Sequence, residues 1–198
     1  MSKKVLWIDL ETTGLESLRH AIIQLAAIAE IDGEVVEEID LRMRPLAKHK
    51  IDEEALATNN LTEPEIRTYP HQADQYRVFE DFLTRYINRY EKLDKFVLAG
   101  YNINTFDEPF LRQLFLDNAT DRKARKYGGY FGSWFFWPKR DVQTYLSEHL
   151  AENGLRLPNY KLATVCEYFN ILITAHDALS DIQATRTLYN VLRFSIKT

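Results

Sequence analysis

The sequence predicts an α/β fold with a mixed sheet, for two reasons. Apolar, β-favouring segments come first in the chain and are followed by segments with helical periodicity. A further short apolar segment lies between two helical ones, which is the pattern of a strand joined to a parallel neighbour by a crossover helix. Because no repeat and no linker rich in Gly, Ser or Pro divides the chain, we expect residues 1–198 to form a single domain.

The first quarter of the chain predicts an antiparallel meander of three strands. Residues 5–10 are apolar and run into the turn-forming segment 12–14, which is typical of a buried strand that ends there. Residues 22–31 are largely apolar and predict the second strand. Residues 32–33 are Asp-Gly, a two-residue hairpin signal, so residues 34–43 are expected to return as the third strand.

The rest of the chain is expected to be helical apart from a strand at residues 96–100. The longest helix, residues 74–93, carries apolar side chains at spacings of three and four and so has one apolar face. The other expected helices are 52–58, a short one opened by the capping box Thr62-x-x-Glu65, 107–117, 141–152, 161–169 and 178–194.

Composition excludes several classes of protein. The net charge of -4 argues against binding nucleic acid through bulk positive charge, although bound divalent cations can reverse the field at a local site. A single cysteine, Cys166, rules out an internal disulfide. No apolar run approaches 18 residues and the polar start leads directly into a strand, so we expect a cytoplasmic protein with no membrane partner.

Two acidic residues mark the end of the first strand. Asp9 and Glu11 are two residues apart, and the period of two in a strand places both carboxylates on one face. A pair of buried acids is unfavourable unless a positive group is bound there. The alternative is a pair at the edge of the strand that faces water.

Two more acids and a histidine lie at other element ends. Asp107 follows the strand 96–100, and by itself it is better explained as the N-cap of the following helix. Asp181 lies in the first turn of the last helix, five residues after His176, and each has an ordinary structural explanation by itself. Taken together with Asp9 and Glu11, they can converge on one crevice. Such oxygen ligands suit two Mg²⁺ or Mn²⁺ ions, with His176 as the general base for a phosphodiester-hydrolysing water.

Three segments resemble the motifs of the DEDDh 3′-to-5′ exonucleases. They are Asp9-Leu10-Glu11-Thr12-Thr13-Gly14-Leu15, Asn102-x-x-x-Phe106-Asp107 and His176-Asp177-Ala178-Leu179-Ser180-Asp181. The resemblance extends over almost the whole chain and is strongest to the nuclease domain of bacterial exonuclease I. It implies a ribonuclease-H-like fold, a mixed five-stranded sheet flanked by helices.

The resemblance also implies a role for each motif residue. Asp9, Glu11 and Asp181 would hold the two metal ions, Asp107 would act through a metal-bound water, and His176 would be the base. The terminal nucleotide would be bound by Thr12, Thr13, Gly14 and Leu15, with Asn102 and Phe106 beside it. The implied reaction is the hydrolysis of single-stranded DNA from its 3′ end to 5′-mononucleotides.

Two alternatives to this function stay open. Residues 7–11 also resemble oligoribonuclease, and nothing in the sequence identifies a probe for the 2′-hydroxyl, so RNA is the nearest rival substrate. A protein that keeps the fold and binds nucleic acid without cleaving it is the second alternative. The complete set of acids with His176 argues against it, because a binding module has no need of five titratable groups at one crevice.

An aromatic segment at residues 127–137 follows four cations, Arg122, Lys123, Arg125 and Lys126, and seven of its eleven residues are aromatic. One interpretation is a last buried strand at 133–137, with Phe135 and Trp137 in the core. For Tyr127, Tyr130 and the four cations, a second interpretation is a groove for single-stranded nucleic acid, in which bases stack on the rings and the cations meet phosphates. A solvated loop that contacts another protein is the third.

Overall fold

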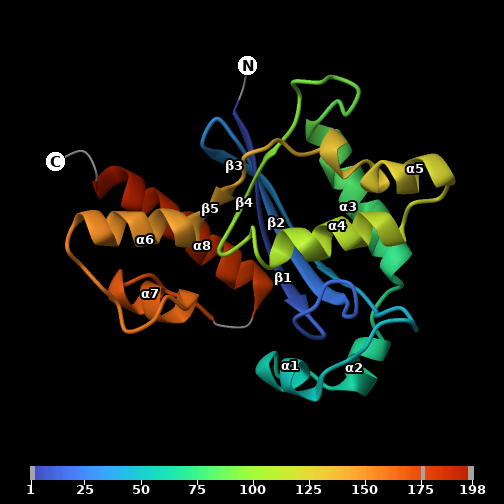
Figure 1. Ribbon diagram of the computed structural model, residues 1–198, viewed down its shortest axis with the longest axis horizontal. Helices are drawn as coiled ribbons and strands as arrows, with labels where there is room; N and C mark the ends of the chain where they lie inside the picture. Colours follow the sequence, from blue (N-terminus) through green and yellow to red (C-terminus); the bar gives the residue numbers. More distant parts are fainter. Residues whose placement is uncertain (1–2, 175–176, 196–198) are drawn as a thin grey trace.

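The structure, a computed structural model, describes residues 3–174 and 177–195. Its centre is a five-stranded sheet with strand order β3-β2-β1-β4-β5 (Figure 1). The strands are β1 (Lys4–Thr12), β2 (Ile22–Ile31), β3 (Glu34–Arg42), β4 (Val97–Gly100) and β5 (Arg140–Asp141). The first three form an antiparallel meander, whereas β4 pairs with β1, and β5 with β4, in parallel. The mixed five-stranded sheet that the sequence predicts is therefore confirmed.

The β2–β3 hairpin turns where the Asp-Gly pair predicts it. Asp32 and Gly33 both have left-handed φ angles, +55° and +97°, which a two-residue turn of the I′ type requires. β3 forms one edge of the sheet, is mostly exposed and carries many acidic side chains. Charge on an exposed edge strand opposes pairing with a further strand.

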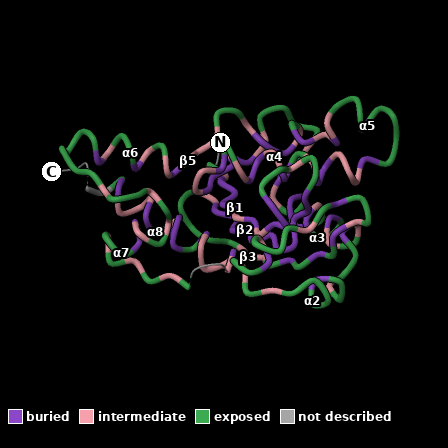
Figure 2. The backbone as a smooth tube through the Cα atoms, turned by 60° about the horizontal axis from the view of Figure 1, so that its bottom comes forward, coloured by how far each residue is buried: buried purple, intermediate pink, exposed green. Residues whose placement is uncertain are grey.

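Helices cover both faces of the sheet (Figure 1). One face packs against α3 (Gln72–Tyr86), α4 (Asp107–Asp117) and the 3₁₀ segment η1 (Gly128–Ser133), beside the short α5 (Arg122–Lys126). The other face packs against α6 (Val142–Glu152), α7 (Leu162–Tyr168) and α8 (Ala178–Ser195). Figure 2 shows the central strands buried beneath these helices.

The strand β1 supplies both hydrophobic cores. Leu6 and Ile8 pack toward α3 and α4, whereas Val5 and Trp7 pack toward α6 and α8, because successive side chains of a strand point to opposite faces. Asp9 continues the series of Val5 and Trp7 and therefore faces the side on which α8 lies. The alternation thus fixes which helix the carboxylate at the end of β1 meets.

The two remaining helices, α1 (Glu53–Thr58) and α2 (Glu63–Arg67), lie apart from the main layers (Figure 1). Leu56 and Ile66 form a small core with Ile23 of β2. Within the part of the chain that the structure describes, no helix has the length and apolar character that crossing a bilayer requires.

The helix expected at residues 74–93 ends seven residues early, at Tyr86. Ile87 is extended, and the side chain of Asn88 accepts a hydrogen bond from the backbone amide of Tyr90. The carboxylate of Asp94 in turn accepts one from the amide of Asn88. Such local bonds compete with helical ones, so the apolar spacing is overridden by turn chemistry.

The strand interpretation of residues 133–137 is wrong. Phe135 makes only an isolated bridge to Phe96, and the fifth strand begins later, at Arg140. Gly129 and Tyr130 adopt left-handed φ angles of +64° and +63°, which breaks the extended chain before it begins. Phe135 is buried as expected, but Trp137 is 77% exposed.

Candidate active site

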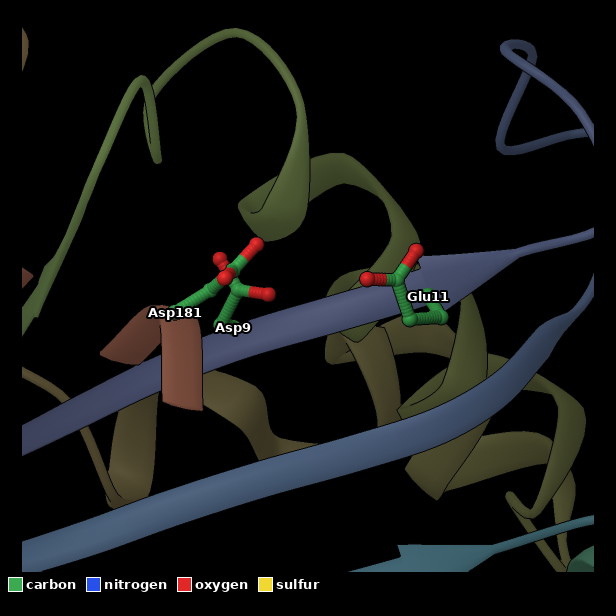
Figure 3. Close-up of side chains that lie close together, drawn as sticks. All are labelled: Asp9, Glu11 and Asp181. Atoms are coloured by element: carbon green, nitrogen blue, oxygen red, sulfur yellow. The ribbon is translucent and has the colours of Figure 1, made fainter. Parts of the chain in front are cut away.

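Three carboxylates converge at the end of β1. Asp9, Glu11 and Asp181 each offer one oxygen, and these atoms all lie within 4.8 Å of one another. Figure 3 shows Asp9 and Glu11 on the same strand and Asp181 reaching them from the start of α8. The convergence that the sequence predicts for these three residues is present in the structure.

Asp107 reaches the same pocket from a different element. Because β4 runs parallel to β1, the two strands end at one edge of the sheet, and the loop after β4 leads directly to α4. Phe106, and not Asp107, holds the N-cap of α4, so capping does not account for Asp107. The open pocket has a volume of about 550 Å³ and is lined by Asp9, Leu10, Glu11, Tyr101, Asn102, Phe106, Asp107, Lys161, Leu162, Ala163, Ile173 and Asp181.

The acids in the pocket destabilise one another's charged forms. Burial and the neighbouring charges of Asp107, Asp181 and Glu11 raise the pKa of Asp9 well above its usual range. Burial, together with the charge of Asp181, raises the pKa of Glu11 to about 7. Burial raises the pKa of Asp107 to about 8. A bound cation would offset both the desolvation and the repulsion.

The donor set fits a hard divalent cation. The clustered ligand atoms of the described residues are carboxylate oxygens, which suit Mg²⁺ and Mn²⁺ better than softer metals. Asp9 and Glu11 come from a rigid strand at the centre of the sheet, so their geometry is fixed before any ion binds. The site therefore has the charge, the oxygen ligands and the rigidity that such an ion requires.

The segment at residues 12–15 divides into structural and accessible residues. Thr12 donates its hydroxyl to the carbonyl of Gly14 (2.7 Å), and Thr13 donates its own to the carbonyl of Lys50 (2.7 Å). A side chain at Gly14 would lie 2.5 Å from the ring of His20, so only glycine fits there. Leu15 is 81% exposed. Leu15 is thus the side chain of this segment that is free to meet a ligand.

Among the other expected residues, Asn102 and Phe106 line the acidic pocket and His176 lies outside the described residues. Asp177, which follows His176, accepts hydrogen bonds from the backbone amide of Ser180 (3.1 Å) and the side chain of Gln24 (3.2 Å). These bonds fix the start of α8 against β2.

Tyr127 and Tyr130 are not brought to the acids. Their rings stack on each other with 6.3 Å between the ring centres. Tyr130 lines a separate groove with Asp117 and Asn118 at the far end of α4. Asp107 begins this helix of 11 residues, so its two ends are about 16 Å apart. The glycines at 128 and 129 turn the chain over Phe115 and hold the two rings at that end.

Sequence reasoning missed Lys161 and Tyr101 as pocket residues. Tyr101 donates its hydroxyl to the carbonyl of Tyr160 (2.6 Å), and the amide of Gln143 donates to the same oxygen (3.0 Å). These bonds fasten the segment before α7, which places the cationic Lys161 at the acidic pocket. Tyr101 directly precedes the motif segment that begins at Asn102, so a signal for it was present, whereas Lys161 lies far from all three motif segments in the sequence.

A sheet of this topology with carboxylates gathered at the end of its first strand defines a metal-dependent nuclease. Residues 6–189 match the RNase T family, which is described as Exonuclease. The chain belongs to this exonuclease family, and its resemblance to the DEDDh 3′-to-5′ exonucleases is confirmed.

Two curated relatives are bacterial polymerases. The chain is 28% identical to DNA polymerase III PolC-type of Oceanobacillus iheyensis over 178 residues, which are 89% of this chain and 10% of that protein. It is 23% identical to the PolC-type polymerase of Lacticaseibacillus paracasei over 188 residues, 93% of this chain and 11% of that protein. The chain thus spans about a tenth of the length of these relatives.

The fold is similar to that of solved exonuclease I structures. The zinc-bound E. coli ExoI–ssDNA complex matches with a TM-score of 0.77 at 20% identity, over 98% of this chain and 41% of that one. E. coli exonuclease I in complex with a dT13 oligonucleotide matches with a TM-score of 0.75 at 20% identity, over 96% of this chain and 41% of that one. At this identity the likeness establishes the ribonuclease-H-like fold.

Proposed function

We propose that this chain hydrolyses single-stranded DNA from the 3′ end and releases 5′-mononucleotides. The observation that carries the proposal is the convergence of Asp9, Glu11 and Asp181 within 4.8 Å, in a pocket that also holds Asp107. A volume of about 550 Å³ lies in the range of pockets that take one small-molecule-sized group, such as a terminal nucleotide. The polarity follows from the exonuclease family to which the chain belongs.

The four acids would hold two Mg²⁺ or Mn²⁺ ions. When bound, such a pair activates a water and stabilises the departing alkoxide of a phosphodiester. Asp9 and Glu11 hold their oxygens in place through the rigidity of β1, and Asp181 and Asp107 complete the set from two helix starts. The raised pKa values of Asp9, Glu11 and Asp107 mean that the chain does not stabilise their charged forms, and a bound cation would supply that stabilisation.

The remaining pocket residues would orient the substrate. Phe106 offers apolar surface to the terminal base, and the ammonium of Lys161 offers a charge for a phosphate. Leu15 does not line the pocket, but its exposed side chain would add apolar surface for the substrate. His176 would take the proton of the attacking water, since an imidazole has a pKa near neutrality. Support for this role comes from its place in the chain directly before Asp177, which is anchored at the start of α8.

DNA is the proposed substrate because two solved relatives with this fold are complexes with single-stranded DNA. RNA stays the rival, and the two are separated by digesting matched oligodeoxyribonucleotides and oligoribonucleotides with Mg²⁺, Mn²⁺ or EDTA. Strands labelled at the 5′ end should shorten stepwise, and strands labelled at the 3′ end should release labelled mononucleotide at once.

The expected result is metal-dependent digestion of DNA from the 3′ end that Asp9→Ala abolishes. Faster digestion of RNA would replace DNA with RNA as the proposed substrate and would leave the proposed reaction unchanged. Binding of the oligonucleotide without any cleavage would favour the non-catalytic alternative. Activity that survives in Asp9→Ala with Mg²⁺ would reject the metal site.

A further inference from the structure

Trp137 stands out among the three tryptophans, all of which lie within the described residues. Trp7 and Trp134 are fully buried in the two cores, whereas Trp137 is 77% exposed. An exposed apolar residue is common and proves nothing by itself. A large aromatic ring that is exposed and also held in one orientation is a different case, because rigid rings favour binding by losing little entropy.

The orientation of Trp137 is fixed from beneath. The ammonium of Lys139 lies 4.0 Å from the centre of its ring, a close cation–π contact. The Lys139 side chain is buried and forms an ion pair with Glu108, which also accepts a hydrogen bond from Arg112 (2.6 Å). One face of the indole thus rests on a buried, immobilised cation, and most of the ring faces solvent.

Two contacts join the segment of Trp137 to the acidic pocket. Glu108, the partner of Lys139, directly follows Asp107 in the first turn of α4. Asp141, four residues after Trp137, accepts a hydrogen bond from the backbone amide of Asn104 (3.2 Å), in the loop that carries Asn102 and Phe106. The segment is therefore fastened to both the loop and the helix turn that line the pocket, yet Trp137 does not line it.

We propose that Trp137 is a stacking platform for a base of the single strand that lies outside the terminal-nucleotide pocket. This inference rests on the proposed function for its ligand, single-stranded nucleic acid. Every base can stack on an aromatic face, so such a platform would bind a single strand independently of its sequence. The fixed ring would hold the strand beside the acidic pocket while the terminal nucleotide of the strand occupies that pocket.

Tryptophan fluorescence tests the platform without hydrolysis. Because Trp7 and Trp134 are buried, quenching by an added oligodeoxynucleotide reports chiefly on Trp137. A decamer titrated into the full chain in EDTA should give saturable quenching, and its binding is followed in parallel by the anisotropy of a dye on the decamer. Trp137→Phe should abolish the quenching and keep most of the affinity, because phenylalanine still stacks.

Trp137→Ala should weaken binding of the decamer by about 5- to 150-fold, the effect expected for removing one stacking ring. Tyr90→Ala is the matched control, since Tyr90 is an exposed aromatic outside the acidic pocket, and it should leave affinity and quenching unchanged. For hydrolysis with Mg²⁺, the ratio of kcat/KM for a decamer to that for a dinucleotide should fall in Trp137→Ala.

Unchanged fluorescence while the decamer binds, or equal affinity in Trp137→Ala and the wild type, would overturn the platform. Quenching that follows protein concentration and not oligonucleotide would mean that a second copy covers Trp137, and would overturn it too. Quenching in a protein that cleaves nothing would reject the proposed function and keep the platform. Cleavage without quenching would reject the platform and keep the proposed function.

Discussion

The two ends of α4 carry the same residue in opposite electrostatic states. Asp107 begins the helix and Asp117 ends it, and both carboxyl groups are almost fully buried. Burial raises the pKa of Asp107 to about 8, and its own and the Leu10 backbone hydrogen bonds offset only part of this. Burial also raises the pKa of Asp117, but hydrogen bonds from His49, Lys48 and Gln113 outweigh it and lower the pKa to about 2.

The difference teaches that burial alone does not mark a functional acid. Asp117 has its counter-charges within the chain, so its ionised form is already satisfied and it contributes to stability. Asp107 faces other carboxylates, and its neighbours Glu11 and Asp141 raise its pKa further. An acid whose surroundings disfavour its charge is one for which an external cation supplies what the chain does not.

The largest effect is expected from removing a carboxylate of the acidic pocket, at the Asp107 end of α4. Asp9→Ala should abolish hydrolysis, while the thermal midpoint measured in EDTA should stay equal or rise, because fewer like charges then repel. Calorimetry with and without Mg²⁺ checks the second part. Asp117→Asn is the matched control at the other end and should still hydrolyse DNA. A large fall of the midpoint in Asp9→Ala would show that Asp9 serves stability instead.

His176→Ala tests the catalytic end without touching the metal ligands. Removing a general base should lower turnover by about 10² to 10⁴, with little change in affinity for DNA. Single-turnover rates and the anisotropy of a labelled oligonucleotide separate the two effects. A wild-type rate at neutral pH would exclude His176 from the reaction.

Asp117→Asn tests the structural end. The lowering of the pKa from 3.8 to about 2 corresponds to about 2 kcal/mol of stability, which the variant should lose. Since the folded pKa lies below the ordinary value, this contribution is present above about pH 4 and is lost as the pH falls toward 2. Urea unfolding between pH 2 and 7 should therefore show that the free energy of unfolding falls less steeply with decreasing pH in the variant than in the wild type. The same pH dependence of the unfolding free energy in both proteins would mean that ionised Asp117 is not stabilised by its partners.

The sequence was sufficient wherever local pattern and burial agree. The alternation in β1 and the Asp-Gly turn at residues 32–33 predict the meander, and the spacing of Asp9 and Glu11 predicts their shared face. It was insufficient where a long-range partner decides the outcome. Asp107 and Asp117 both lie at helix ends, and only the fold reveals that Lys48 and His49 reach the second of them.

The aromatic segment shows the same limit. Its rings are equally apolar in sequence, yet Phe135 is buried while Trp137 lies outside. The segment is not a regular strand, so the two side chains do not share one face. Lys139, which contacts the ring of Trp137, pairs with Glu108 across about 30 residues. Periodicity has no information about such contacts, so the exposed ring near the pocket was found only in the structure.

The smallest expected effect concerns the cations beyond the Asp117 end. Replacing the four basic residues of α5, Arg122, Lys123, Arg125 and Lys126, by Ala should leave the salt dependence of DNA binding nearly unchanged, because α5 lies at the end of α4 away from the acids. Each lost phosphate contact would reduce the slope of log K against log salt by about 0.7. Equal slopes would limit the binding face to the Asp107 end. A slope lower by two contacts or more would extend it along the whole helix, and the groove that the sequence predicts at Tyr127 and Tyr130 would then join the acidic pocket in one path for the strand.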